Sequence, residues 1–274
     1  IPALACLIAP PLLRARNRNT PLLFVLGAIW LTDVYFLYAL MRDDGQLARS
    51  ALLVGIDIIL LLITVIGGRI VPVFTANALR GRGLSADIRS SRWIDGTVIG
   101  AMIAVVLVDV LAPWHPVAGG VAALAAIAQA WRLMGWRSSR TLNEPLVWSL
   151  HLAYAWLPAG LAMKAIHLLT GAAWCARWLH ALTIGVAASM ILAVMSRAAL
   201  GHTGRPLAAA RPVAVAYLLL CLATLVRVLA PSLVAVEYRW TVMVAGALWV
   251  AAFALFLMTY TPILMRPRID ARPG

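Results

Sequence analysis

The sequence predicts an all-α membrane protein, a polytopic transmembrane helix bundle of about eight full spans plus one partial N-terminal helix. Only 12% of its 274 residues are charged and its mean hydropathy is +0.92, whereas soluble domains carry roughly 25% charged residues. Apolar runs of about 18 residues or more, long enough to cross a bilayer as helices, recur along the chain. Basic residues gather in every second connection between these runs. Residues 1–274 are therefore expected to form a single transmembrane domain.

The apolar runs define the expected helices in order. The first run, 1–13, is too short to cross a hydrocarbon core of about 30 Å at 1.5 Å per residue. It also lacks the basic segment and the cleavage site of a signal peptide, so we interpret it as the end of a helix that begins before this chain. The eight runs that follow are long enough to span, and they cover 22–41, 50–74, 94–112, 116–136, 146–169, 178–200, 212–230 and 239–262.

The distribution of charge predicts the orientation of the bundle. A net charge of +13 would suit nucleic acid, but most arginines follow the alternating pattern that orients membrane proteins, with basic loops in the cytoplasm. We therefore expect the lipid bilayer and not nucleic acid as partner, with a cytoplasmic C-terminus and cytoplasmic connections at 14–21, 70–93, 132–145 and 198–211. The arginines of this pattern are Arg14, Arg16, Arg18, Arg69, Arg80, Arg82, Arg89, Arg92, Arg132, Arg137, Arg140, Arg197, Arg205, Arg211, Arg266, Arg268 and Arg272.

Several charged residues fall inside the apolar runs, where each costs about 2.5–3.5 kcal/mol to insert. Asp57, Asp109, Lys164 and Arg227 are expected in the outer half of the bundle, and Asp33 near its middle. One interpretation is mutual pairing, for example of Asp57 with Lys164, that locks the bundle. The other is a polar cavity open to the outer face that holds a charged ligand or a proton path. The sequence leaves both open.

Two histidines on consecutive helices are candidate metal ligands. His151 shares a helix face with Tyr154, and His180 opens the next run, where small residues leave room for a neighbouring helix or for a flat cofactor such as a porphyrin. Imidazole binds haem iron and copper, although a buried histidine is also often a hydrogen-bonded structural residue. Counting helix rise, the two histidines lie near one plane or up to about 10 Å apart. Near one plane they would flank one cofactor, and further apart, the arrangement we favour, they would serve separate sites or pair with histidines of preceding helices.

Two glycine-rich, arginine-bearing segments punctuate the chain on the expected cytoplasmic side. They are GGRIVPVFT, residues 67–75, and GHTGRP, residues 201–206. Paired glycines and Pro72 are expected to break the first helix and to present backbone groups to a ligand. With Arg69 and Arg205, the two segments are predicted to form one pocket for a propionate, a phosphate or a lipid head group, with their backbones within about 15 Å. The alternative is two helix C-caps that carry orienting arginines.

Four segments, GGRIVPVFT (67–75), LHLAYAWLPAG (150–160), LHALTIG (179–185) and MSRAALGHTGRP (195–206), resemble motifs of the NnrS family in order and spacing. The resemblance implies a protein of the bacterial inner membrane with about twelve transmembrane helices, of which this chain would be the C-terminal two-thirds. It implies haem and copper as cofactors, a role in the response to nitric oxide and nitrosative stress, and a link to denitrification. The WHxHE-type stretch of the family's first helices is not found here.

The resemblance also implies roles for individual residues. His151, His180 and His202 match motif histidines and are the expected metal-binding residues. Tyr154, Arg69 and Arg205 match other motif positions and are expected to help bind the cofactor, and Arg197 matches a further motif position. Nitric oxide or a related small ligand is the expected partner. No catalytic residue is implied, and whether the protein is an enzyme stays open.

Two functions from other classes remain as alternatives. A small-solute or ion transporter would also carry intramembrane charges, and it would usually show paired broken helices in two halves. A non-catalytic membrane sensor or assembly factor is the other alternative. Absorbance of the purified protein separates the haem-binding interpretation from both alternatives, because bound haem gives an intense Soret band.

Overall fold

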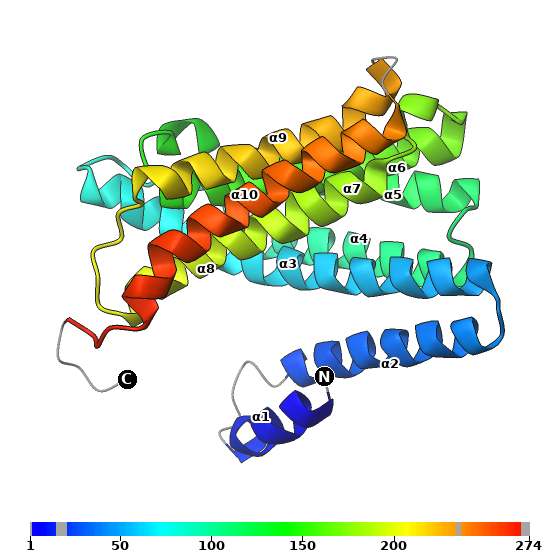
Figure 1. Ribbon diagram of the computed structural model, residues 1–274, viewed down its shortest axis with the longest axis horizontal. Helices are drawn as coiled ribbons and strands as arrows, with labels where there is room; N and C mark the ends of the chain where they lie inside the picture. Colours follow the sequence, from blue (N-terminus) through cyan, green and yellow to red (C-terminus); the bar gives the residue numbers. More distant parts are fainter. Residues whose placement is uncertain (1, 15–20, 234–236, 270–274) are drawn as a thin grey trace.

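The structure is a computed structural model that describes residues 2–14, 21–233 and 237–269. Within these ranges the chain is helical and contains no strand, and eight helical stretches are long and apolar enough to cross a membrane. The all-α bundle expected from the apolar runs is therefore confirmed (Figure 1). The elements are α1 (Pro2–Arg14), α2 (Pro21–Met41), α3 (Gly45–Gly81), α4 (Arg92–Leu111), α5 (Pro116–Met134), η1 (Ser138–Thr141), α6 (Pro145–Thr170), η2 (Ala173–Cys175), α7 (Trp178–His180), η3 (Ala181–Ala188), α8 (Ser189–His202), α9 (Arg211–Leu233) and α10 (Tyr238–Leu264).

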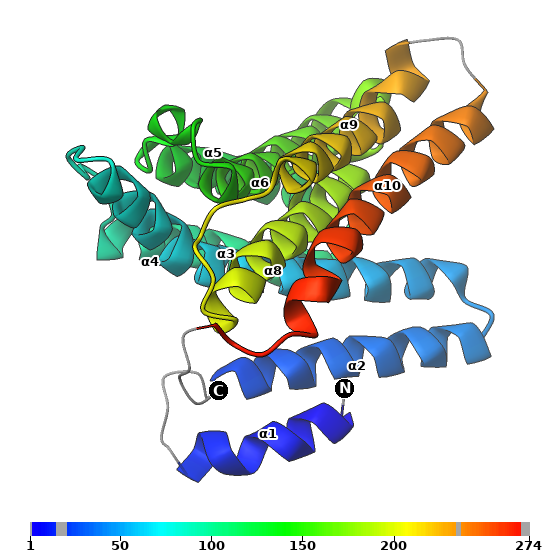
Figure 2. The ribbon, with the colours of Figure 1, turned by 60° about the vertical axis from the view of Figure 1, so that its left-hand side comes forward.

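Helix α6 lies at the centre of the bundle and contacts α3, α5, α8, α9 and η3. Helix α2 lies along the outside of α3, and α1 lies along α2, so α1 and α2 join the rest of the bundle mainly through α3 (Figures 1 and 2). On the other side, α10 packs along α9 and α8. A cofactor or ligand site inside the bundle is thus most enclosed around α6, which has the largest buried share of any span.

Helix α3 does not break at Pro72. It continues for 37 residues, from Gly45 to Gly81, with Pro72 in its interior. The proline removes one backbone donor, but side chains of neighbouring helices pack against this stretch and α3 remains helical. The predicted broken helix end was therefore wrong, and the connection expected at 70–93 shrinks to 82–91.

The run 178–200 is one continuous helix with an irregular middle. Residues Ala181–Ala188 form a π-helix between α7 and α8, and Ser189 donates from its hydroxyl to the carbonyl of Ile184, five residues earlier. A Cβ added at Gly185 would lie 2.6 Å from Cγ of Trp156 on α6. At Gly185, the room left by small residues is thus taken by a neighbouring helix.

The alternate connections gather at one end of the bundle, which we call the basic end. It comprises residues 82–91, 135–144, 203–210 and 265–269 (Figure 1). Arg137 forms an ion pair with Asp87 at 2.8 Å, and the backbone N–H of Ile269 donates to the carbonyl of Thr203 at 3.4 Å. These contacts tie the first two segments to each other and the last two to each other.

The basic end is expected to face the cytoplasm. In a variant without the native cysteines, Ser85→Cys should resist an impermeant thiol reagent added to intact cells from outside. His115→Cys, exposed in the connection between α4 and α5 at the opposite end, should react under the same conditions. Labelling of the cysteine at position 85 with protection of that at 115 would reverse the orientation.

Candidate functional site

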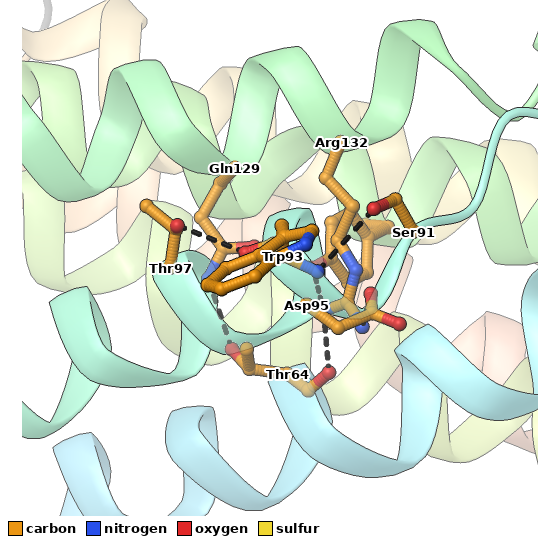
Figure 3. A network of polar contacts seen from close by, with 8 residues as sticks. Thr64, Ser91, Trp93, Asp95, Thr97, Gln129 and Arg132 are labelled. Atoms are coloured by element: carbon orange, nitrogen blue, oxygen red, sulfur yellow. Dashed lines mark hydrogen bonds and ion pairs between the residues drawn. The ribbon is translucent and has the colours of Figure 1, made fainter.

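A buried arginine joins four helices in the half of the bundle next to the basic end. Arg132, on α5, has only 3% of its side chain exposed and forms an ion pair with Asp95 of α4 at 2.8 Å. Its Nη1 donates to the carbonyl of Thr64 on α3 at 2.8 Å and to the hydroxyl of Tyr154 on α6 at 3.2 Å. Figure 3 shows the guanidinium between Asp95 and Thr64. A buried charge is tolerated where it is paired and hydrogen-bonded in this way.

Gln129 extends this set of contacts one turn earlier on α5. Its side-chain N–H donates to the hydroxyl of Thr64 at 3.0 Å, and its carbonyl oxygen accepts from the hydroxyl of Tyr154. We call Thr64, Asp95, Gln129, Arg132 and Tyr154 the Arg132 network. Because its members come from α3, α4, α5 and α6, the network fixes the relative positions of these helices.

The glycine pair of GGRIVPVFT makes room for this network. A Cβ added at Gly68 would lie 1.5 Å from Nη2 of Arg132, so the guanidinium rests directly against the α3 backbone. At Gly67 an added Cβ would meet the ring of Tyr154 at 3.4 Å. The glycines therefore admit side chains of α5 and α6, whereas the sequence suggested that they loosen α3.

His151 is buried on α6 and has a hydroxyl at each ring nitrogen. Its Nε2 lies 2.8 Å from Oγ1 of Thr75 on α3, and its Nδ1 lies 2.8 Å from Oγ of Ser138 in η1. The hydroxyl hydrogen of Thr75 is already donated to Val71, so Oγ1 must accept from Nε2–H. In a neutral imidazole the Nδ1 lone pair then faces Ser138 and accepts its hydroxyl hydrogen.

A groove of about 610 Å³ opens beside His151. Its polar lining consists of His151, Ser138 and Ser139, while apolar side chains form the rest. Small-molecule sites are commonly mostly apolar, with a few polar groups that fix orientation. The remaining lining residues are Leu133, Leu142, Trp148, Leu152, Ala155 and Leu218.

Three of the four segments that carried the family resemblance meet in this region. Tyr154 packs on Gly67, His151 bonds to Thr75, and the guanidinium of Arg197 lies 3.9 Å from the ring centroid of Phe74. A family model described as NnrS protein matches residues 1–268. The chain belongs to the NnrS family. Searches among curated proteins and among solved structures found no match.

In this NnrS chain the two main candidate ligands lie at different depths. Ala181, next to His180, packs against Gly160 of α6. Gly160 lies nine residues after His151, so the two levels are about 13 Å apart along α6 at 1.5 Å per residue. This spacing favours separate sites over one cofactor flanked by both imidazoles. His202 is exposed at the end of α8, next to the basic end.

His151 fits a haem or copper ligand as a single imidazole. Histidines that bind metals usually donate their second ring N–H to a fixed acceptor, and Thr75 is such an acceptor for Nε2–H. Nδ1 faces the hydroxyl of Ser138, a residue that lines the same groove. Among the residues that the structure describes, no three His, Cys, Asp or Glu side chains gather to hold a metal.

The two arginines expected to share a pocket have different surroundings. Arg69 is exposed and lines a groove of about 510 Å³ with Arg80, Asn77 and Asp95. Arg205 is partly exposed and donates to the carbonyl of Thr203 at 3.5 Å. Arg197, four residues before GHTGRP, lies against Phe74 of GGRIVPVFT, while a pocket shared by Arg69 and Arg205 stays a prediction.

The sequence interpretation missed most of the Arg132 network. Arg132 was counted only as an orienting arginine, yet it stands three residues after Gln129 near the end of an apolar run. Two strongly polar residues on one face of an otherwise apolar helix indicate a buried polar contact. Thr75 and Ser138 carry no comparable signal, because single hydroxyl residues are common in helices and connections of membrane proteins.

Proposed function

We propose that this NnrS chain is part of a haem- or copper-binding membrane protein of the nitric oxide response, and that His151 is a ligand of the bound metal. The observation that carries the proposal is the buried imidazole beside an apolar groove, with Nε2–H held by Thr75 and Nδ1 turned toward Ser138. Family membership supports the connection to nitric oxide. Haem iron or copper, when bound, would supply the coordination position for that small ligand.

The chain's own residues would prepare the imidazole for this role. Thr75 fixes the tautomer and the ring plane, and the lone pair of Nδ1 would be released when the Ser138 hydroxyl turns away. Trp136, whose ring centroid lies 6.1 Å from that of His151 and 4.6 Å from that of Tyr154, supports the other side. The apolar walls of the groove would keep water from the ligand.

The remaining expected residues belong to the same proposal in separate places. His180, half-buried near Arg177 and Arg227 at the end opposite the basic end, would serve a second metal or pair with helices outside this chain. His202, Arg69 and Arg205 lie toward the basic end, where the arginines suit the acidic groups of a cofactor. We place the protein in the bacterial inner membrane with the basic end in the cytoplasm, with a role in denitrification and nitrosative stress, and assign no catalytic residue.

The transporter alternative has less support from the fold. Broken helices paired between two halves are the usual mark of such a site, and the break expected at Pro72 is absent because α3 is continuous. The metal content of the purified protein also separates the proposal from a non-catalytic sensor or assembly factor that binds no haem or copper.

Replacing His151 by alanine in the full-length protein should reduce haem or copper per mole of protein by more than about half, because the metal would lose a ligand. Soret absorbance and metal analysis of the purified protein measure this. His167→Ala is the matched control, since His167 lies on the same helix and contacts only the carbonyl of Ala172 among the bonds described. Unchanged metal content in a folded His151→Ala variant would leave His151 as a structural residue.

A further inference from the structure

Three charged side chains from three helices are buried together on the far side of the bundle from the basic end. Lys164 of α6 forms an ion pair with Asp109 of α4, and both are almost fully buried. Asp57 of α3 is also fully buried, and the Lys164 ammonium lies 5.0 Å from the ring centroid of Trp178. The sequence offered Asp57 as a partner of Lys164, but Lys164 pairs with Asp109 and leaves Asp57 as a second acid.

The charges of this triad do not balance if all three groups are ionised. Two carboxylates and one ammonium carry a net charge of −1 in a region from which water is excluded. An isolated buried charge is costly, and a group in that position usually neutralises or finds a counter-ion. The charged groups that face Asp57 are Asp109 and Lys164, and the single ammonium is already paired.

The hydrogen bonds also indicate a missing proton. Neither oxygen of Asp57 has a donor among the described residues, and Oδ1 of Asp109 lacks one as well. An ionised carboxylate only accepts hydrogen bonds, so two neighbouring carboxylates cannot satisfy each other. A protonated carboxyl group gains one O–H donor, and a pair of carboxyl groups in one site commonly shares one proton for this reason.

We propose that Asp57 and Asp109 form a proton-binding site, in which Asp57 holds the proton and donates it as a hydrogen bond to Oδ1 of Asp109. The proton comes from water, and it converts the Asp57 carboxylate to the neutral acid. Asp109 keeps its negative charge and its other oxygen stays paired with Lys164. The triad is then neutral, and the oxygen Oδ1 of Asp109 gains its missing donor. This inference does not depend on the metal proposed at His151.

Infrared difference spectroscopy of the purified full-length protein in lipid nanodiscs tests the proposal. At neutral pH the wild type should show the C=O stretch of a protonated carboxyl group, sensitive to exchange into heavy water, and Asp57→Asn should lose it. Asp87→Asn is the matched control and should keep the band, because Asp87 is an exposed acid paired with Arg137. Absence of the band from the wild type, or its persistence in Asp57→Asn, would overturn the proposal.

Thermal stability distinguishes a protonated Asp57 from an ionised Asp57 and from a site occupied by a metal cation. Asp57→Asn replaces a neutral acid by a neutral amide and should shift the melting temperature by less than about 3 °C, whereas Asp109→Asn strips Lys164 of its partner and should lower it by more than about 5 °C. If sodium chloride stabilises the wild type over choline chloride at equal ionic strength, and Asp57→Asn abolishes this, a sodium ion occupies the site and the proposal fails. Should Asp109→Asn not fold, the wild-type band and the sodium comparison still decide.

Discussion

Replacing Gly68 by alanine is expected to destabilise the bundle by about 3 kcal/mol or more. The new Cβ would lie 1.5 Å from Nη2 of Arg132, so the guanidinium must move. It has little freedom to do so, because it is buried and bound to Asp95, Thr64 and Tyr154. The apparent melting temperature in detergent measures the loss. In a variant without Cys6 and Cys221, the buried thiol of Cys175 would report unfolding by reaction with a fluorogenic dye.

Gly67→Ala is the matched control for this experiment. The Cβ at Gly67 would meet the Tyr154 ring at 3.4 Å, which is an ordinary van der Waals contact. Both substitutions add one methyl group to the same turn of α3 and change helix propensity equally. Equal melting temperatures for the two variants would show that the contact with Arg132 is not what requires glycine at position 68.

Replacing Arg132 by methionine should cost about 2–3 kcal/mol, because buried hydrogen-bond partners on α3 and α6 lose their donor. The carboxylate of Asp95 would lose its ion pair, and Tyr154 would lose the donor at its hydroxyl. The same melting assay measures the effect. Arg137→Met removes an ion pair whose side chains are 36% and 66% exposed, and it should cost no more than about 1 kcal/mol. A similar loss in both variants would mean that the Arg132 network adds little beyond surface charge.

The two substitutions together test their coupling. In the Arg132→Met background, Gly68→Ala should cost much less stability than in the wild type. The constrained guanidinium that clashes with the new Cβ is then replaced by a flexible thioether. The double variant should therefore be more stable than the sum of the single effects predicts. Additive losses would contradict direct contact between Arg132 and the α3 backbone as the cause.

Hydropathy located the spans well but not their full length. The run expected at 116–136 corresponds to Pro116–Met134, whereas the run expected at 50–74 continues as a helix to Gly81. Hydropathy reports which residues prefer lipid, and it does not detect helical turns that extend beyond the apolar core. The last turns of α3 are polar, but η1 packs against this helix, and the hydroxyl of Ser138 meets the same His151 ring as Thr75.

The candidate site was predictable in part. The shared face of His151 and Tyr154 followed from helical spacing, and both side chains are indeed buried. The contact of Gly68 with Arg132 could not be predicted, because a glycine in a helix indicates a close approach without identifying the residue that approaches. Its partner, Arg132, lies 64 positions away on α5, and one sequence carries no local pattern that pairs residues at that distance.

The π-helix between α7 and α8 has a consequence for how this helix carries its side chains. A π turn contains about one residue more than an α turn, so it changes the phase of the helix by about 100°. Trp178 fixes the phase of one half against Lys164, and Arg197 fixes the other against Phe74. Residues 181–188 absorb the difference. Deleting one residue from this stretch would rotate one half of the helix relative to the other. Either Trp178 would then turn away from Lys164, or Arg197 would turn away from Phe74.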